Sequence, residues 1–192
     1  MGILIAGLVL FLGVHSVRIL ANDWRATQIA KIGEKPWKGI YAVVSLIGFV
    51  LIVWGFGRAR VDALILWQPP LWMWTVTSVL TLPAFILIVA GNLKGTRMKE
   101  RLGHPMLLGT KLWAFAHLIA TAHLAGVILF GSFLAWSIVE YASARRRDRA
   151  AGVVYPAGRL SRDAIAVVAG VLLWVVFAWW LHGALIGLRP LG

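Results

Sequence analysis

The chain alternates between long apolar stretches and short segments that hold most of its charge. Six stretches are apolar enough to be membrane spans, which need about 20 mostly apolar residues. They cover residues 2–20, 37–56, 71–92, 105–119, 123–141 and 163–188. Because lipid offers the backbone no hydrogen-bond partner, this pattern predicts an all-α, polytopic integral membrane protein built as a six-helix bundle.

The fourth stretch is shorter than the others, at about 22 Å when each residue adds 1.5 Å. A three-residue link at positions 120–122 joins it to the fifth stretch. One bent helix over both stretches is the alternative, but it would be about 55 Å long, nearly twice the thickness of the hydrocarbon layer. We therefore expect a helical hairpin whose first helix is short.

Lys and Arg residues concentrate in alternate connections between the stretches. The first, third and fifth connections, together with the span ends that flank them, carry 15 of them, the second carries only Arg58 and Arg60, and the fourth carries none. Positively charged loops stay on the cytoplasmic side of a membrane. The asymmetry predicts that the odd-numbered connections are cytoplasmic and that both termini lie on the outer, periplasmic side.

The composition supports a membrane protein with a single domain over residues 1–192. The chain is 60% hydrophobic and 14% charged, and its mean hydropathy is +0.84. The net charge of +12 is distributed among the connections, which is typical of topology-setting residues and lipid-headgroup contacts rather than of nucleic-acid binding. The absence of cysteine excludes disulfides, thiolate ligation of haem, iron–sulfur clusters and Cys-based zinc sites.

Two histidines, His15 and His117, lie well inside predicted spans. An ionisable side chain at membrane depth is costly and indicates a functional site. When residues are counted from the span ends, the levels of these two histidines differ by only about 6 Å. That offset predicts a pair of metal ligands that flank a haem. A packing role, with imidazoles hydrogen-bonded between helices, is the alternative.

Two basic residues favour a haem, because they are placed to meet its propionates. Arg18 follows His15 by three residues and shares its helix face, and Lys111 lies about 9 Å inside the fourth span. The alternative for both is that the side chains extend to the lipid headgroups. The remaining histidines, His104, His123 and His182, lie near span boundaries, where capping or interfacial roles are expected.

The sequence resembles the NnrU family of bacterial membrane proteins over essentially its whole length. The segments that carry the resemblance are LVLFLGVHSVR at 8–18, GEKPWKGIYAVVSLIGFVLIVWGFG at 33–57 and GHPMLLGTKLWAFAHLIA at 103–120. The resemblance implies a six-span protein of the bacterial inner membrane, linked by name with nitrite and nitric oxide respiration. It also implies kinship with plant 15-cis-zeta-carotene isomerase, which is thought to bind haem b through two histidines.

Matched motif by motif, the resemblance places the haem ligands on His15 and His117 and the histidine of the His-Pro motif on His104. It implies haem b as cofactor, the lipid bilayer as surroundings and a lipid-soluble polyene as substrate of a redox-controlled cis–trans isomerisation. Electron transfer, haem handling and nitric oxide sensing are the other roles it implies. Relatives often carry Asn-Gly-Asp in the link after the fourth span, where this chain has Thr121-Ala122-His123.

Two other functions fit the sequence. The pattern from His104 to Trp113 also resembles membrane methyltransferases of the isoprenylcysteine and phospholipid classes, in which a glutamate pair and a tyrosine-rich tail follow the next span. Here Glu140 stands alone and a basic run at 145–149 follows it, which weakens this reading. The third interpretation is a non-catalytic assembly or regulatory factor for denitrification enzymes, with histidines that only pack.

The predicted orientation can be tested with a topology reporter fused to each terminus. Because the basic connections remain in the cytoplasm, both reporters are expected to report the periplasmic side. A reporter inserted in the third connection, near Lys94, should report the cytoplasm and serves as the control. A cytoplasmic signal from the C-terminal fusion would contradict the orientation.

Overall fold

The computed structural model describes residues 1–188 and residue 190, and 81% of these residues are helical. The elements are α1 (Gly2–Leu20), α2 (Asn22–Ile32), α3 (Glu34–Ala59), α4 (Trp72–Asn92), α5 (Arg97–Leu102), α6 (Pro105–Ala120), α7 (Leu124–Ala150), α8 (Leu160–Val176), the π-helical turn η1 (Phe177–Leu181) and α9 (His182–Ile186). No strand forms within the described residues, which confirms the predicted all-α class.

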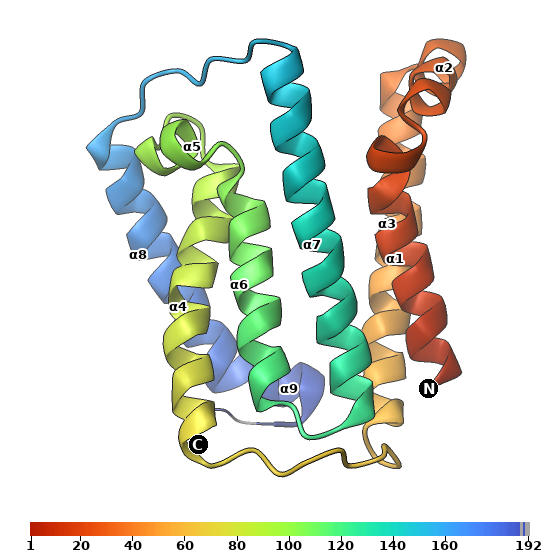
Figure 1. Cartoon of the computed structure of the whole chain (residues 1–192), viewed down its shortest axis with the longest axis vertical. Helices are drawn as coiled ribbons and strands as arrows, with labels where there is room; N and C mark the ends of the chain where they lie inside the picture. Colours follow the sequence, from red (N-terminus) through yellow and green to blue (C-terminus); the bar gives the residue numbers. More distant parts are fainter. Residues whose placement is uncertain (189, 191–192) are drawn as a thin grey trace.

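The long helices run lengthwise and alternate in direction, so their connections gather at two ends (Figure 1). Helices α2 and α5 and the connection at 151–159 lie at one end, which we call the basic end because the Lys- and Arg-rich connections meet there. The connections at 60–71 and 121–123, the start of α1 and the end of α9 lie at the opposite end. The charge asymmetry of the sequence is therefore an asymmetry of the folded molecule.

Five of the six predicted spans coincide with helices that are long and apolar enough to cross a membrane. These are α1, α3, α4, α7 and the continuous stretch Leu160–Ile186. Helix α6 has 16 residues, about 24 Å, and is the short helix that the sequence predicts. Its crossing of the membrane, and with it the count of six spans and the orientation, stays a prediction.

The predicted helical hairpin is confirmed, since α6 and α7 are separate helices joined at residues 121–123 (Figure 1). The link is held by backbone hydrogen bonds to the connection between α3 and α4. Leu66 N–H donates to the Ala122 carbonyl at 2.8 Å, and Leu124 N–H donates to the Leu64 carbonyl at 2.9 Å. These bonds satisfy backbone groups that neither helix can pair internally.

Several helices extend beyond the apolar stretches from which they were predicted. Helix α7 continues from the predicted end at 141 to Ala150, through the basic run, because straight-chain Arg and Ala residues favour helix. Helices α2 and α5 lie inside predicted connections. Trp24 of α2 is 53% exposed and contacts Trp37, which is typical of aromatic side chains at a membrane interface.

Helices α1 and α3 pack closely because glycines leave room for the partner backbone. A Cβ atom added at Gly55 would lie 2.5 Å from the Leu4 nitrogen, and one added at Gly48 would lie 2.8 Å from the Phe11 nitrogen. Small residues at such contacts let helices associate in lipid, where van der Waals packing provides most of the attraction.

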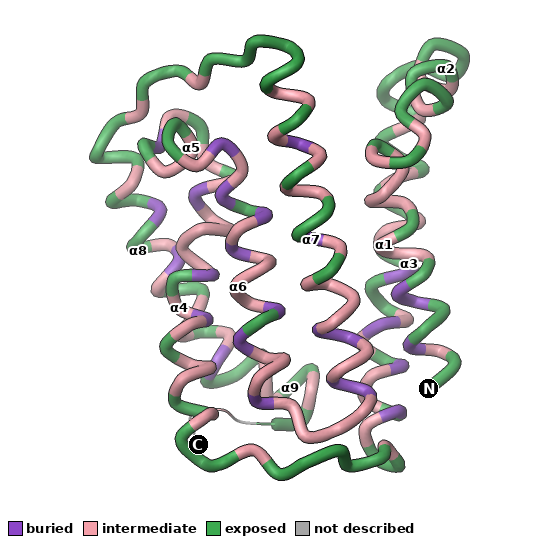
Figure 2. Tube along the Cα trace, viewed as in Figure 1, coloured by how far each residue is buried: buried purple, intermediate pink, exposed green. Residues whose placement is uncertain are grey.

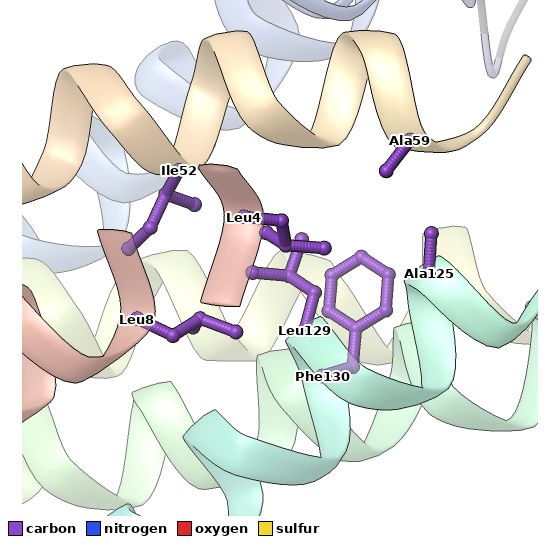
Figure 3. Packing of buried hydrophobic residues seen from close by; sticks show 7 residues of the cluster. All are labelled: Leu4, Leu8, Ile52, Ala59, Ala125, Leu129 and Phe130. Carbon is purple, nitrogen blue, oxygen red and sulfur yellow. The ribbon is translucent and has the colours of Figure 1, made fainter. Parts of the chain in front are cut away.

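Buried apolar side chains form a cluster between α1, α3 and α7 toward the opposite end of the molecule. Figure 3 shows its members, Leu4, Leu8, Ile52, Ala59, Ala125, Leu129 and Phe130. Figure 2 shows that many residues outside this cluster are exposed. They include large apolar residues such as Val9, whose exposed fraction is 68%, and Leu172, whose exposed fraction is 60%. Exposed apolar surface of this extent suits contact with lipid rather than water.

The close contact between α1 and α3 gives a matched pair of substitutions. Gly55→Ala should destabilise the folded protein by about 1–3 kcal/mol, because its Cβ collides with backbone that cannot rotate away. Gly57→Ala is the control, since a Cβ there would meet nothing within 4 Å. The measurement is the unfolding midpoint of each variant in detergent; equal midpoints for the two variants would contradict the packing described here.

Candidate functional site

His15 lies on α1 in the half of the helix nearer the basic end. Its Nδ1 is 2.7 Å from the Phe11 carbonyl oxygen, and its ring stacks on the Phe11 ring with centroids 4.2 Å apart. A carbonyl oxygen only accepts hydrogen bonds, so Nδ1 carries the proton and Nε2 keeps its lone pair. His15 is therefore held in the tautomer that leaves Nε2 free to accept a hydrogen bond or bind a metal.

The surroundings of His15 come from two further helices. The ring of Tyr41, on α3, lies 5.1 Å from the His15 ring, and the ring of Trp136, on α7, lies 5.9 Å from it. Ser45 is one helical turn after Tyr41 and Glu140 is one turn after Trp136, so both pairs share a helix face. We call these five residues the His15 cluster.

Three polar atoms of the His15 cluster are buried without a hydrogen-bond partner among the described residues. They are Ser45 Oγ, Trp136 Nε1 and Glu140 Oε2. The other carboxylate oxygen of Glu140 accepts from Arg147 at 2.8 Å, and Arg147 also donates to Ser143 Oγ at 2.7 Å. An unpaired buried polar atom costs about 1–3 kcal/mol, so these atoms make the His15 cluster a candidate binding site.

His117 lies on α6 and is held in the same tautomer as His15. Its Nδ1 is 2.9 Å from the Trp113 carbonyl oxygen, which again leaves Nε2 with the lone pair. The ring stacks on Phe130 with centroids 4.7 Å apart and lies 5.2 Å from the Trp113 ring. The surroundings of His117 are therefore aromatic.

Helix α7 places the two histidines relative to each other. His15 contacts Trp136 and His117 contacts Phe130, six positions apart, or about 9 Å along α7 and about 120° around it. Phe133 lies between these positions, and its ring contacts Phe11 at 5.8 Å and Trp113 at 5.5 Å.

The structure thus places the two predicted ligands against different parts of α7. An imidazole nitrogen lies about 2 Å from a metal that it binds, so two imidazoles on one iron have nitrogens about 4 Å apart. The donor set, two imidazoles with free Nε2 atoms, fits ligation of haem. The Phe133 ring lies between their neighbours Phe11 and Trp113, and the sharing of one iron by the pair stays a prediction.

The two basic residues predicted to meet haem propionates lie in different surroundings. Arg18 is exposed in the last turn of α1. The Lys111 ammonium lies over the Tyr141 ring at 4.7 Å, a cation–π contact that ties it to α7. Arg147, which the sequence did not single out, is the basic side chain bonded to the His15 cluster.

His104 belongs to a second polar cluster at the basic end. Its Nε2 lies 2.7 Å from Asp148 Oδ2 and 3.3 Å from the Tyr155 hydroxyl, and Tyr155 donates a hydrogen bond to Asp148. The Arg145 guanidinium lies 3.9 Å from Asp148 Oδ2 and 6.0 Å from the centroid of the Tyr155 ring. These contacts join the start of α6 to the end of α7 and to the connection at 151–159.

The sequence held a signal for this second cluster. Asp148 is the one acidic residue between positions 141 and 162, within a run of arginines. A single carboxylate in such a run is a natural partner for a distant histidine, but its partner cannot be identified before the fold brings the segments together.

His123 and His182 lie toward the opposite end, as predicted. His123 precedes α7, forms an isolated bridge with Ile65, and its buried Nδ1 has no partner among the described residues. His182 Nδ1 lies 2.7 Å from the Leu188 carbonyl oxygen. Within the described part of the chain, no three His, Asp or Glu side chains gather in a way that could hold a metal ion.

These features define a multi-pass helical membrane protein with a polar cluster set among its apolar helices. A family model described as NnrU protein matches residues 3–190, nearly the whole chain, and the chain belongs to this NnrU family. Neither a comparison with curated proteins nor one with solved structures gave a match.

The His104 cluster predicts an effect of pH at the basic end. Partial burial and the hydrogen bond to Asp148 raise the pKa of Tyr155 above its ordinary value of 10.0. The folded protein therefore holds this proton more tightly than the unfolded chain, so the stabilising contribution is present below pH 10 and is lost as the pH rises through the raised pKa. Tyrosinate absorbance of the wild type, less that of Tyr155→Phe, should titrate above pH 10.

Asp148→Asn is the control for this titration. Removing the carboxylate should lower the Tyr155 pKa toward its ordinary value, because the charge that opposes tyrosinate is gone. A Tyr155 signal that titrates at pH 10 in the wild type and in Asp148→Asn alike would contradict the cluster.

Proposed function

We propose that this protein binds haem b within the membrane through imidazole ligation, with His15 and His117 as the candidate ligands. One observation carries the proposal: both imidazoles donate Nδ1–H to the carbonyl one turn earlier, which leaves both Nε2 atoms free. Haem-ligating histidines need a lone pair on one ring nitrogen and an orienting hydrogen bond on the other.

The surroundings of both histidines suit a flat, conjugated group. Phe11, Trp113, Phe130 and Phe133 form a continuous series of ring contacts between α1, α6 and α7. Apolar aromatic surroundings accept a macrocycle, and the basic side chains Arg18, Lys111 and Arg147 lie toward the end where acidic substituents would find partners. When bound, haem b would supply a redox-active iron, whose potential responds to burial and to axial ligation.

Two roles follow for such a protein within the NnrU family. The family's association by name with nitrite and nitric oxide respiration favours electron transfer or gas sensing in the inner membrane. The resemblance to plant 15-cis-zeta-carotene isomerase favours a redox-controlled isomerase of a lipid-soluble polyene, a substrate that shares the bilayer with the site.

The alternatives receive less support from the described side chains. A methyltransferase-like enzyme would hold its nucleotide-type cofactor near His104, where His104, Asp148 and Tyr155 already satisfy one another. In a factor whose histidines only pack, the unpaired polar atoms of the His15 cluster would lower the stability of the fold and serve no function. The cost of these atoms is the reason to prefer a ligand-binding function.

The absorption spectrum of the purified protein tests the proposal. Protein expressed with sufficient haem and purified in detergent should carry a Soret band, and reduction should sharpen and shift its visible bands. The double variant His15→Ala/His117→Ala should lose the band because both imidazoles are gone, while Trp179→Phe, on a residue that is 58% exposed, should keep it. A wild type without a Soret band, or an unchanged band in the double variant, would reject haem ligation by these residues.

A further inference from the structure

We infer that an anionic phospholipid, from the leaflet at the basic end, binds along the outer surface where α6 and α7 meet. Lys111 and Arg145 receive its phosphate, and Phe115 and Ile138 contact its acyl chains. We call these four residues and Tyr141 the α6–α7 seam. The seam does not depend on haem, and it gives Lys111 an anionic partner other than a haem propionate.

Lys111 is a cation among apolar residues without a counter-charge nearby. It lies six positions after Pro105, about 9 Å along α6 from the basic end. Its ammonium lies over the Tyr141 ring at 4.7 Å, but it forms no ion pair within the part of the chain that the structure describes. A cation–π contact leaves the charge in place, and an uncompensated charge near hydrocarbon is costly. Lys111 therefore needs an anion that the described residues do not supply.

The position of Lys111 on α6 indicates that this anion comes from the bilayer. Phe115 follows Lys111 by four positions, shares its helix face, and is 46% exposed. His117, in contrast, is six positions from Lys111 and thus about 120° away around the helix. Lys111 is therefore on the outer side of α6 and not on the side where His117 packs on Phe130.

Helix α7 continues the same surface. Ile138, Tyr141 and Arg145 follow one another at helical spacing, and Ile138 is 47% exposed. Because α6 and α7 run in opposite directions, Phe115 and Ile138 both lie about one turn farther from the basic end than the contact of Lys111 with Tyr141 (Figure 1). Arg145 lies one turn nearer to that end. The seam is thus basic toward the headgroups and apolar toward the acyl chains, which is the division that a phospholipid has.

The two cations of the seam favour a lipid with a net negative charge. Side chains of a helix tilt toward its N-terminus, which for α6 is the basic end, so the long Lys111 side chain extends toward the headgroups. The Arg145 side chain is 33% exposed and lies 3.9 Å from Asp148, a carboxylate that His104 contacts more closely, at 2.7 Å. A guanidinium has five N–H donors, so Arg145 keeps donors for a phosphate.

Native mass spectrometry of the purified, delipidated protein tests the seam. The wild type should bind phosphatidylglycerol more tightly than phosphatidylcholine with the same acyl chains. Lys111→Gln should lower the affinity for phosphatidylglycerol by roughly 5-fold, the effect of one basic residue near the membrane surface. Lys111→Arg keeps the charge and should retain the wild-type affinity. Equal affinity of the wild type for the two lipids would overturn the inference.

Lys38→Gln is the matched control. It removes the same charge at the same end of the molecule, but the Lys38 ammonium already has a partner, since it lies 2.7 Å from Glu34 Oε1. This variant should keep the wild-type affinity for phosphatidylglycerol. Equal losses in Lys38→Gln and Lys111→Gln would mean a general attraction to the basic end, and would overturn the assignment to the seam.

The headgroup alone distinguishes a lipid from a soluble anion. Phosphatidylglycerol should raise the unfolding midpoint of the wild type in detergent, and should raise that of Lys111→Gln less. Glycerophosphoglycerol has the same phosphate without acyl chains and should change neither midpoint, because it cannot contact Phe115 and Ile138. An equal rise with this compound would mean a site for a soluble anion, and would overturn the assignment to a lipid.

Discussion

Hydrocarbon offers no hydrogen bonds, so every polar group that this chain places among its spans must find a partner within the protein or from a ligand. Backbone groups meet this requirement by pairing within helices. His15 and His117 each satisfy one of their two ring nitrogens, because Nδ1–H donates to a carbonyl of the same helix. The His15 cluster does not meet it, because Ser45, Trp136 and Glu140 each keep an unpaired buried atom among the described residues. The preference for a ligand-binding function over a packing role depends on these atoms.

The packing of the bundle explains where the exception occurs. Glycines close α1 against α3, and the apolar cluster of Figure 3 joins both helices to α7 toward the opposite end. Farther along α7 the contacts are between aromatic rings, such as Phe133 with Trp113, and beyond them lie the polar groups of Trp136 and Glu140. The interface thus changes from aliphatic to aromatic to polar toward the basic end, where acidic substituents of a ligand would meet arginine.

Much of the fold follows from the sequence, because hydropathy and charge act over whole segments. The apolar stretches, the short fourth helix, the hairpin and the basic end could all be predicted. The helices α2 and α5 were missed because interfacial and short helices lack a long apolar run. Counting residues predicts that the levels of the two histidines differ by about 6 Å, and their ring neighbours on α7, Trp136 and Phe130, are six residues or about 9 Å apart along that helix.

The arrangement of the site could not be predicted in the same way. Depth fixes the position of a side chain along the membrane normal, whereas sharing an iron also depends on how each helix is rotated about its axis. That rotation turns His15 toward Trp136 and His117 toward Phe130, on different faces of α7. Likewise Asp148 and Tyr155 became partners of His104 only through the contact between the ends of α6 and α7.

A density map of the wild-type protein, purified with its native lipids and cofactors in nanodiscs, tests this account most directly. The account predicts ligand density larger than a water molecule that reaches His15 Nε2, Trp136 Nε1 and Ser45 Oγ. Direct hydrogen bonds from Trp136 and Ser45 to other side chains, with no ligand density at His15, would contradict it.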